Sequence, residues 1–425
     1  MAHTKVLILG GGFAGINAAK ALGGSGIDVW LIDKTNHHLF QPLLYQVASA
    51  ALSPGDIAVP IREIVRPYPN VTVIMGEVIQ IDKEKHEVVL KNGDRVGYEF
   101  LIVALGARHS YFGKNEWEVF APGLKTLADA VKIRERILIS FEKAERCDSI
   151  TEARKYLNFV IIGGGPTGVE MAGAISEIAY HTMLQDFRRI DTSKTKIHLV
   201  EGSPHVLPVY PEKLSLKAEK YLAHFGVNVI TGKRVIDVNK EGVAMDGLFI
   251  PAENVVWAAG NQASAVLKTL GVPLDRQGRV NVAPDLSVPE HPEIFVVGDA
   301  ACVMDKNGKP LPALAPVAVQ QGRYVAHLLR KQIAKVAHPP FVYFDKGTMA
   351  TIGKSKAIGM FGKLQFSGLV AWLGWSCVHI LYLIGFRNRL AVLFNWAWSY
   401  FTYQRGARLI TGTSPVKAKR RQSHG

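Results

Sequence analysis

Lys5-Val-Leu-Ile-Leu-Gly-Gly-Gly-Phe-Ala-Gly15 is the stretch that decides the fold of this chain. Its apolar start predicts a short buried strand, its glycines a tight turn, and the alanine-rich residues Ile16–Leu22 a helix. A second strand is expected at Asp28–Ile32 and leads directly into Asp33. Strand, glycine turn, helix, strand and acid, in that order, indicate a Rossmann-type dinucleotide-binding unit.

The same order occurs a second time in the chain. A strand at Phe159–Ile162 runs into Gly163-Gly-Gly-Pro-Thr-Gly168, followed by a helix at Val169–Ile178 and a strand at Lys196–Val200 that ends at Glu201. The acid comes later after the turn in this copy, and an insertion at His181–Ser193 accounts for the extra length. One glycine turn is a weak signal, but two copies with the same surroundings make an ordinary glycine loop a poor explanation.

Each glycine of such a turn has its own task. The first permits a sharp bend, the second lets the backbone approach a pyrophosphate, and the third lets the helix pack closely on the strand. The helix N-terminus attracts the phosphates, and the acid accepts hydrogen bonds from a ribose hydroxyl. The residues expected in these roles are Gly10, Gly12, Gly15 and Asp33 in the first copy, and Gly163, Gly165, Gly168 and Glu201 in the second.

The composition is that of a folded protein with an anionic partner. A chain of 425 residues predicts two or three domains, and a formal net charge of +14 favours a nucleotide, an anionic membrane surface or nucleic acid. No nucleic-acid motif accompanies the charge, so no nucleic-acid partner is expected. Much of the charge lies near the apolar C-terminal region, at Arg387, Arg389, Arg405, Arg408 and Lys417–Arg421.

Cys147, Cys302 and Cys377 lie far apart and form no CxxC pair. This spacing gives no support to a metal site or a disulfide framework, and it favours a reducing compartment. The N-terminus enters a strand almost at once and leaves no room for a signal or transit peptide, which is therefore not expected.

Three further segments carry a resemblance. Ala104-Leu-Gly106 and Ala258-Ala-Gly260 each follow an expected strand, and Gly298-Asp299 follows another. With the two glycine turns, they make residues 4 to 330 similar to the two-dinucleotide-binding flavoproteins, whose architecture is like that of glutathione reductase. The resemblance implies FAD at the first turn and a nicotinamide dinucleotide at the second. Asp299 matches the acid that bonds the flavin ribityl chain, although a turn or N-cap aspartate is the alternative.

Asn36–Ala48, Gly163–Glu170 and Ala315-Pro-Val-Ala-Val-Gln-Gln321 narrow the resemblance to the type II NADH dehydrogenases. The last segment is similar to their quinone-site motif AQxAxQ. Pro316 replaces the first Gln and puts in doubt any hydrogen bond from side chain 316 to a quinone. The resemblance implies a quinone site at Pro316, Gln320 and Gln321; the two glutamines also fit a polar helix start.

The resemblance also assigns expected roles residue by residue. FAD is expected at Gly10, Gly12, Phe13, Ala14, Gly15, Asp33, Lys34, Val78, Ala104, Gly106, Gly298, Asp299, Ala315 and Val317. NADH is expected at Gly163, Gly165, Thr167, Gly168, Glu201 and Gly260. The Glu201 carboxylate would repel the 2′-phosphate of NADPH, and no Arg or Lys stands beside it in the sequence, so NADH is predicted over NADPH.

Glu170 and Gln320 are the expected catalytic residues. Glu170 lies in the first turns of the helix after the second glycine turn. The resemblance places it near the nicotinamide and the flavin, where it helps to relay protons and where burial should raise its pKa. The alternative is a carboxylate that simply stabilises a helix N-terminus.

The C-terminal region is strongly apolar. Gly368–Phe386 is a run of 19 residues without Asp, Glu, Lys or Arg, about 28 Å long as a helix. Arg387-Asn-Arg389 is expected to break it, and the 12 residues Leu390–Phe401 then form a helix too short to span a bilayer. Asn395, Ser399 and Thr402 make one polar stripe on it. The residues expected in an interfacial aromatic belt are Trp372, Trp375, Trp396, Trp398, Tyr400 and Tyr403.

These patterns favour a helical pair that lies in one leaflet, with its basic residues on anionic headgroups. A single span and a hidden dimer interface are the alternatives. His379 either faces the quinone or is a packed residue.

Together the observations predict an α/β protein with two Rossmann-like domains. The expected ranges are residues 1–115 and 275–335 for FAD, 116–274 for NADH, and 336–425 for a C-terminal helical region that associates with the membrane. The resemblance implies a non-proton-pumping NADH:quinone oxidoreductase, without a metal, at the cytoplasmic face of a bacterial inner membrane, as a homodimer.

Three other functions stay open at this point. Sulfide:quinone oxidoreductase needs redox cysteines, and only Cys302 follows the Gly298-Asp299 segment closely. A soluble NADH:ferredoxin-type reductase leaves the apolar C-terminus unexplained. A flavin-binding redox sensor or apoptosis-factor-like interaction protein would use the basic surface without quinone turnover.

Overall fold

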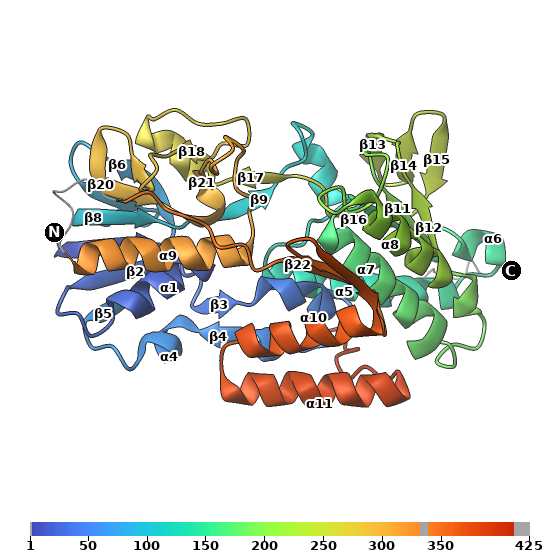
Figure 1. The fold of residues 1–425 in the computed structure, drawn as a ribbon. Helices are drawn as coiled ribbons and strands as arrows, with labels where there is room; N and C mark the ends of the chain where they lie inside the picture. The colour runs from blue at the N-terminus through green and yellow to red at the C-terminus, as the bar shows by residue number, and fades with distance from the viewer. Residues whose placement is uncertain (1, 332–338, 412–425) are drawn as a thin grey trace, which may run out of the picture. The chain divides into compact units, whose positions relative to one another are not determined.

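The computed structural model describes residues 2–331 and 339–411 (Figure 1). They belong to two compact units, each assembled from three segments of the chain. Unit 1 comprises Met1–Leu39, Ala58–Ser110 and Asn261–Lys346, and unit 2 comprises Phe40–Ile57, Tyr111–Gly260 and Gly347–Gly425. The C-terminal segment from Gly347, expected as a region of its own, therefore belongs to unit 2, and the domain ranges expected from the sequence stay a proposal. The basic tail Lys417–Arg421 lies outside the described residues.

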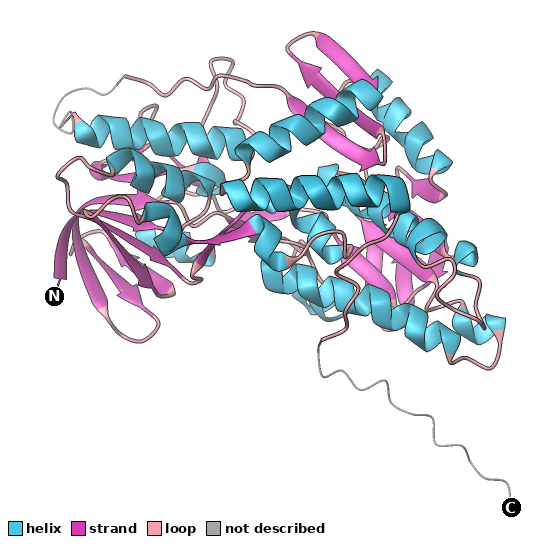
Figure 2. Ribbon diagram, turned by 90° about the horizontal axis from the view of Figure 1, so that it is seen from below, coloured by secondary structure: helices cyan, strands magenta, loops and turns pink. Residues whose placement is uncertain are grey.

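Unit 1 is built on an eight-stranded sheet. Its parallel part has the order β20-β8-β1-β2-β5, made of His291–Val296, Arg95–Val103, Ala2–Leu9, Val29–Asp33 and Val71–Met75. The antiparallel strands β19 (Ser287–Val288), β6 (Val78–Asp82) and β7 (Glu87–Leu90) extend it. Helix α1 (Phe13–Leu22) packs against α9 (Ala315–Arg330). The strands near the N-terminus fan out in Figure 2, as expected for a twisted sheet.

Shorter elements complete unit 1. Two antiparallel pairs are β3 with β4 and β9 with β17, at His37–Leu39, Ala58–Pro60, Ala107–His109 and Asn261–Ala263. Strand β18 (Val280–Asn281) pairs in parallel with β21 (Ala301–Cys302). The short helices are α4 (Ile61–Val65), η5 (Ala265–Leu270) and η6 (Gly298–Ala300).

Unit 2 repeats the central strand order of unit 1. Its four parallel strands are β12-β11-β10-β16, at Val227–Ile230, Lys196–Val200, Asn158–Ile162 and Asn254–Trp257. The predicted repeat is therefore present, with β10 and β11 in the places of β1 and β2. The long helices are α5 (Leu127–Glu145), α7 (Pro166–Glu177) and α8 (Glu212–His224). The meander β13 (Val235–Asn239), β14 (Gly242–Met245) and β15 (Leu248–Pro251) forms a separate sheet.

The remainder of unit 2 includes the C-terminal segment. Strands β22 (Thr348–Gly353), β23 (Lys356–Phe361) and β24 (Leu364–Gly368) form an antiparallel sheet that leads into α10 (Leu369–Tyr382) and α11 (Phe386–Thr402). The other short elements are η1 (Gln41–Leu43), α2 (Leu44–Ala48), α3 (Pro54–Ile57), η2 (Asn115–Val119), α6 (Ile150–Ala153), η3 (Ile178–Thr182) and η4 (Thr192–Lys194). The short helices η3 and η4 overlap the two ends of the insertion that was predicted before Glu201.

Burial explains why the apolar runs form the central strands. Leu7, Ile8 and Leu9 of β1 are fully buried, as are Ile102 of β8 and Phe295 of β20. Strands covered on both faces need such continuous apolar runs. Each large apolar side chain buried in this way stabilises the fold by roughly 1.5–3 kcal/mol.

The C-terminal helices begin and end where the sequence did not predict. The chain breaks at Leu383–Gly385, and Gly385 has a φ of 90°. Arg387 and Arg389 lie inside the first turn of α11 rather than in a break. Arg389 donates to the carbonyl oxygens of Leu381 and Leu383 at 2.9 and 2.8 Å, so it satisfies acceptors at the end of α10. Within the described residues, no helix is long and apolar enough to cross a membrane.

Candidate functional site

The glycine turn of unit 1 has the geometry expected of a phosphate cradle. Gly10 has a φ of +103°, and a Cβ on Gly15 would lie 1.8 Å from the Gly10 carbonyl oxygen. A Cβ on Gly12, by contrast, would have no protein atom within 4 Å. The backbone at Gly12 is therefore exposed at the start of α1, where helix N–H groups attract phosphate. The residues present fit a bound dinucleotide.

Asp33 fastens this turn to the second strand. Its Oδ2 atom accepts a hydrogen bond from the Gly11 N–H at 2.6 Å, and its Oδ1 atom accepts from the Thr35 N–H at 2.6 Å. His38 adds a bond from its Nδ1 atom to the Gly11 carbonyl at 2.9 Å. Burial lowers the pKa of His38, so this ring is neutral and donates from Nδ1. Sequence analysis did not predict that Gly11 and His38 help to hold this turn.

The other residues expected to bind FAD surround this turn within unit 1. Ala104 directly follows β8, and its carbonyl oxygen would lie 2.4 Å from a Cβ on Gly10. Gly106 follows it with a φ of +66°. Phe13, Ala14 and Gly15 form the first turn of α1. Lys34 lines a hollow that also includes Met75, Gly76, Glu77, Lys91 and Asn92, and the buried Val78 opens the next strand.

The Gly298-Asp299 segment is held by Gln321. The Gly298 N–H donates to Oε1 of Gln321 at 2.6 Å, and the Gln321 side chain is buried. Ala315, Pro316 and Val317 form the first turn of α9, whose Gly322 lies against the carbonyl of Ala14. Gln321 therefore positions the glycine–aspartate turn. Pro316 lies in the first turn of α9, where proline is favoured in helices.

Gln320 has both ends of its amide engaged within unit 1. Its Nε2 atom donates to the Phe344 carbonyl at 2.9 Å, and its Oε1 atom accepts from the Phe344 N–H at 3.0 Å. In this structure the side chain fastens the segment after α9, and its expected quinone contact stays a prediction.

The glycine turn of unit 2 repeats this geometry. Gly163 has a φ of +109°, and a Cβ on Gly168 would lie 1.8 Å from the Gly163 carbonyl oxygen. A Cβ on Gly165 would again meet no protein atom within 4 Å. Thr167 lies in the first turn of α7, and Gly260 follows β16 with a φ of +71°. This turn fits a second dinucleotide.

Glu201 fastens the second turn as Asp33 fastens the first. Its Oε2 atom accepts from the Gly164 N–H at 2.6 Å, and its Oε1 atom accepts from the Ser203 N–H at 2.7 Å. The structure adds a neighbour that the sequence did not predict, because a basic residue lies beside Gly202, the residue after Glu201. A Cβ on Gly202 would be 3.5 Å from Cγ of Arg234, an exposed side chain. The chain folds back after β12, so sequence proximity could not indicate this neighbour.

Glu201→Gln is expected to raise kcat/KM for NADPH by roughly tenfold or more. A carboxylate about 4 Å from a phosphate costs up to about 4 kcal/mol at an effective dielectric near 20, and Arg234 would then attract the phosphate. NADH use should weaken modestly, because an amide has one oxygen for two backbone donors. Steady-state rates with both nucleotides measure the effect. Adding Arg234→Ala should reverse the gain, and an unchanged preference in Glu201→Gln would refute the role of the charge.

Glu170 lines a cavity within unit 2. The walls come from α2, α7, β22, α10, α11 and the residues after α11. Burial raises the pKa of the Glu170 carboxyl well above its ordinary value, and a hydrogen bond from the Thr351 backbone opposes this rise. The predicted direction of the pKa shift is confirmed. The raised pKa favours the protonated form, which is able to donate a proton.

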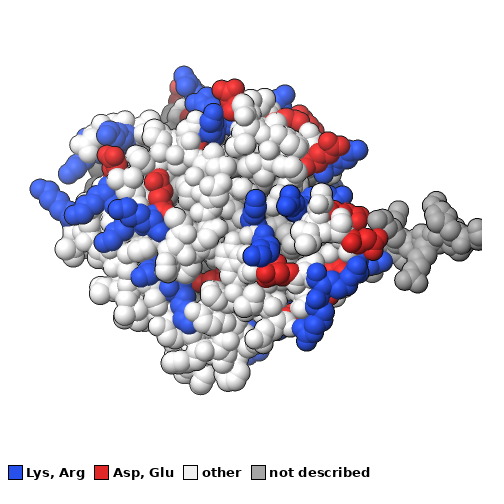
Figure 3. Space-filling view, turned by 90° about the vertical axis from the view of Figure 1, so that its right-hand side faces the viewer, with Lys and Arg blue, Asp and Glu red and all other residues white. Residues whose placement is uncertain are grey.

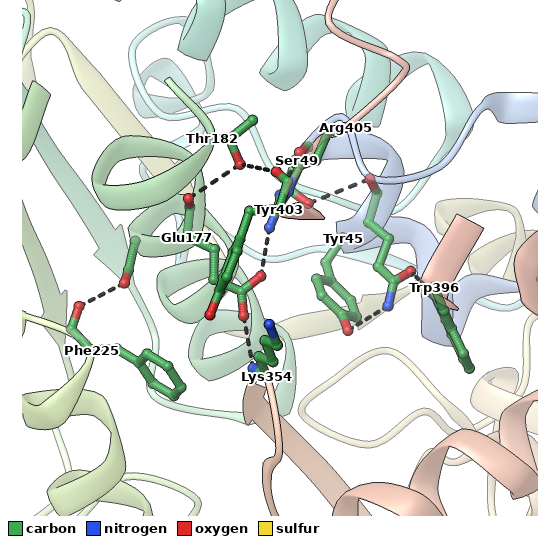
Figure 4. A network of polar contacts seen from close by, with 11 residues as sticks. Tyr45, Ser49, Glu177, Thr182, Phe225, Lys354, Trp396, Tyr403 and Arg405 are labelled. Atoms are coloured by element: carbon green, nitrogen blue, oxygen red, sulfur yellow. Dashed lines mark hydrogen bonds and ion pairs between the residues drawn. The ribbon is translucent and has the colours of Figure 1, made fainter. Parts of the chain in front are cut away.

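A polar network closes one side of this cavity (Figure 4). Arg405 is buried and donates to Oε2 of Glu177 and to the Ser49 carbonyl, both at 2.7 Å. Oε1 of Glu177 accepts from the Lys354 N–H at 2.8 Å. The Lys354 ammonium lies 3.7 Å from the centre of the Tyr403 ring. This network joins the chain after α11 to α7 and α2.

The network corrects the expectation that Arg405 contacts lipid headgroups. A buried arginine needs a partner, and Glu177 supplies it within unit 2. Arg408 is likewise paired with Asp186.

The prediction of an interfacial aromatic belt is also wrong for most of its six residues. Trp375 is buried, and the half-buried Trp372, Trp396, Tyr400 and Tyr403 line the cavity. Among the six, only Trp398 is largely exposed. His379 is a packed residue, with Nδ1 2.7 Å from the Trp375 carbonyl and a pKa that burial lowers to about 4.

Comparisons with known proteins agree with this geometry. The model of the pyridine nucleotide-disulphide oxidoreductase family matches residues 4–322. Two Mycobacterium tuberculosis proteins, each named a type II NADH:quinone oxidoreductase, are 43% and 44% identical to this chain. Each alignment covers 96% of this chain, and 90% and 89% of the respective relatives. The chain belongs to the type II NADH:quinone oxidoreductases.

Solved structures of lower identity show the same fold. NDH2 from Plasmodium falciparum in complex with NADH has a TM-score of 0.87 and 21% identity, covering 95% of this chain and 99% of that one. The sulfide:quinone oxidoreductase of Aquifex aeolicus has a TM-score of 0.69 and 17% identity, over 92% of each chain. Family membership confirms the predicted α/β fold class, the resemblance, and the class of enzyme, a flavin- and NADH-dependent oxidoreductase.

Proposed function

We propose that this type II enzyme transfers a hydride from NADH to FAD and then two electrons to a membrane quinone, without pumping protons. The overall reaction is NADH + H⁺ + quinone → NAD⁺ + quinol. Bound FAD would supply the two-electron carrier that this reaction requires. The observation that carries the proposal is the pair of glycine turns, one in each unit, each open at its second glycine and fastened by an acid.

The two turns have different proposed ligands. FAD is assigned to the turn of unit 1, because the Gly298–Asp299 segment and the N-terminus of α9 lie in the same unit and are held to each other by Gln321. NADH is assigned to the turn of unit 2, where Glu201 adds a negative charge that disfavours a 2′-phosphate.

The quinone site is proposed at Pro316, Gln320 and Gln321 of unit 1. Separately, Glu170 of unit 2 is proposed as the acid that supplies protons for the reaction. Cys302 is a buried thiol, and within the described residues none of Cys147, Cys302 and Cys377 forms a disulfide. A sulfide-oxidising reaction needs a pair of redox cysteines, so these thiols favour quinone reduction by NADH.

Glu170→Gln is expected to lower the rate of quinone reduction by roughly a hundredfold, a typical loss for a general acid. The wild-type rate should fall as pH rises through the raised pKa of Glu170, because the proton is then lost. The variant should lack this alkaline limb while NADH still reduces the flavin. Quinone reduction that keeps the wild-type rate and pH profile would remove Glu170 from the mechanism.

Membrane attachment is proposed through α10 and α11. Their exposed apolar side chains are Leu369, Val370, Leu373, Val378, Leu381, Phe386, Leu390, Leu393, Phe394, Trp398 and Phe401. In Figure 3 the lowest part of the surface, where Figure 1 places α11, is drawn mostly white. Asn395 and Ser399 instead line the cavity, so α11 turns these two polar side chains toward the cavity and the apolar side chains named above toward its exposed face. This arrangement suits a helix lying in one leaflet.

The cytoplasmic face of a bacterial inner membrane and a homodimeric state belong to the same proposal. Cysteines without a disulfide among the described residues fit a reducing compartment, and the alignment with a bacterial relative covers 96% of this chain. No nucleic-acid partner is proposed.

One experiment tests the proposed activity. The protein is purified in detergent and supplied with NADH, NADPH or sulfide as donor and a soluble quinone as acceptor. We expect turnover with NADH, little with NADPH and none with sulfide. Stable reduction of the flavin by NADH, with negligible quinone turnover, would favour a redox sensor instead.

A further inference from the structure

The cavity beside Glu170 is polar enough to hold water. It has a volume of about 100 Å³ and includes side chains of Tyr45, Gln46, Glu170, Asn395 and Trp396. Polar cavities bind water where at least roughly 10–15 Å³ and several hydrogen-bonding groups are present. The space therefore accommodates several water molecules.

Trp375 supplies an independent sign of bound water. Its side chain lines the cavity and is only 2% exposed, yet its Nε1 atom has no hydrogen-bond partner among the described residues. Buried N–H groups seldom lack an acceptor. An ordered water in the cavity would satisfy this donor.

A short chain of hydrogen bonds sets the direction of the Tyr45 hydroxyl. Nε1 of Trp396 on α11 donates to Oε1 of Gln46 at 2.7 Å, and Nε2 of Gln46 donates to the Tyr45 oxygen at 2.8 Å (Figure 4). Because an amide nitrogen only donates, Tyr45 accepts this bond and its own proton is directed to another acceptor. Tyr45 is thus a donor with a fixed orientation at the cavity wall.

The cavity brings Tyr45 and Glu170 together, since both side chains line it. Burial and then the nearby Glu170 carboxyl raise the pKa of Tyr45, while Arg405 acts in the opposite direction. Glu177 also lines the cavity but is already paired with Arg405. The other titratable groups facing the cavity or Glu170 are Lys354, Tyr210, Tyr400 and Tyr403. Glu170 forms no ion pair within the described residues.

We propose that Tyr45 relays protons from cavity water to Glu170, with Gln46 and Trp396 as positioning residues that orient its hydroxyl. The inference rests on the proposed function. When Glu170 gives a proton toward the quinone, the Tyr45 proton moves to the Glu170 carboxylate, and water returns a proton to the phenol. One proton enters for each one delivered, and no electrons move through Tyr45.

Tyr45→Phe tests the relay, because it keeps the ring and removes the hydroxyl. We expect a fall of about tenfold in kcat for quinone reduction, in the range of a lost proton-transfer group, and a larger solvent deuterium isotope effect on kcat. The KM for NADH and the rate of flavin reduction by NADH should not change. Trp396→Phe should shift the same quantities in the same direction by a smaller amount.

A second readout needs neither NADH nor quinone. The infrared C=O band of protonated Glu170, identified by its loss in Glu170→Gln, should move to higher wavenumber in Tyr45→Phe. The matched control is Tyr98→Phe, since the Tyr98 hydroxyl is buried in unit 1 and has no hydrogen-bond partner in the part of the chain that the structure describes; it should leave all readouts unchanged. An unchanged isotope effect and carboxyl band in Tyr45→Phe would overturn the relay.

The two proposals fail in different ways. If the wild-type protein does not reduce quinone, the proposed function fails, and the infrared shift still reports whether Tyr45 and Glu170 interact. If quinone reduction is normal in Tyr45→Phe, only the relay fails.

Discussion

Gly12→Val is expected to yield a folded protein without flavin, and Gly165→Val a protein that keeps its flavin but is not reduced by NADH. Both glycines have φ values near −70°, which any residue adopts, and a Cβ at either position meets no protein atom within 4 Å. The added side chain therefore spares the fold and fills the space through which the backbone approaches a pyrophosphate. Each binding affinity should fall by at least about a hundredfold, since the loss of such an approach exceeds about 3 kcal/mol.

The visible flavin spectrum and anaerobic NADH titration measure these effects. Gly55→Val is the matched control, because its Cβ also meets no atom within 4 Å and it lies outside both turns; it should behave as wild type. The assignment of ligands to the turns would be reversed if Gly165→Val lost the flavin. It would be refuted if both variants kept full flavin and normal reduction.

Substituting Phe394, Trp398 and Phe401 together by Asp is expected to release the protein from membranes. The three side chains are 71%, 65% and 81% exposed and lie on one face of α11. Each large apolar side chain that enters lipid contributes roughly 1.5–3 kcal/mol, so their joint loss weakens partitioning by about a thousandfold or more. Because these residues are exposed, the fold and NADH-driven flavin reduction should persist.

Vesicle sedimentation with mixed neutral and anionic lipids measures the release. The matched control replaces Ile150, Val209 and Ile236 by Asp, since these are 78%, 70% and 59% exposed in unit 2 and lie outside α10 and α11. Equal sedimentation of the wild type and the α11 variant would contradict a membrane-lying helix. Release of the wild type by high salt alone would assign attachment to charge instead.

Local sequence predicted the parts of the fold that local physics controls. The strands β1, β2, β10 and β11 follow from apolar runs buried on both faces, and the turns at Gly10 and Gly163 follow from backbone angles that glycine alone adopts readily. The site residues Asp33 and Glu201 were found because each directly ends a predicted strand.

The features that sequence missed depend on contacts between distant residues. Arg234 lies beside Gly202, the residue after Glu201, only because β12 leads the chain back. Arg405 pairs with Glu177, and Trp396 bonds Gln46 across 350 positions of sequence. Composition placed both Arg405 and Trp396 at the membrane. Hydropathy cannot distinguish an aromatic ring in lipid from one that lines a cavity. The break between α10 and α11 was predicted at Arg387–Arg389 and lies instead at Leu383–Gly385. Arg389 belongs to α11 and from there caps the end of α10.

In the proposed reaction, one flavin passes electrons from NADH, bound at the turn of unit 2, to a quinone. Anaerobic stopped-flow absorbance of the purified wild-type protein follows both half-reactions. We expect NADH to bleach the flavin band in a single turnover, and a soluble quinone added next to restore it fully at a rate no slower than steady-state turnover. A flavin that NADH reduces but quinone does not reoxidise would contradict this reaction.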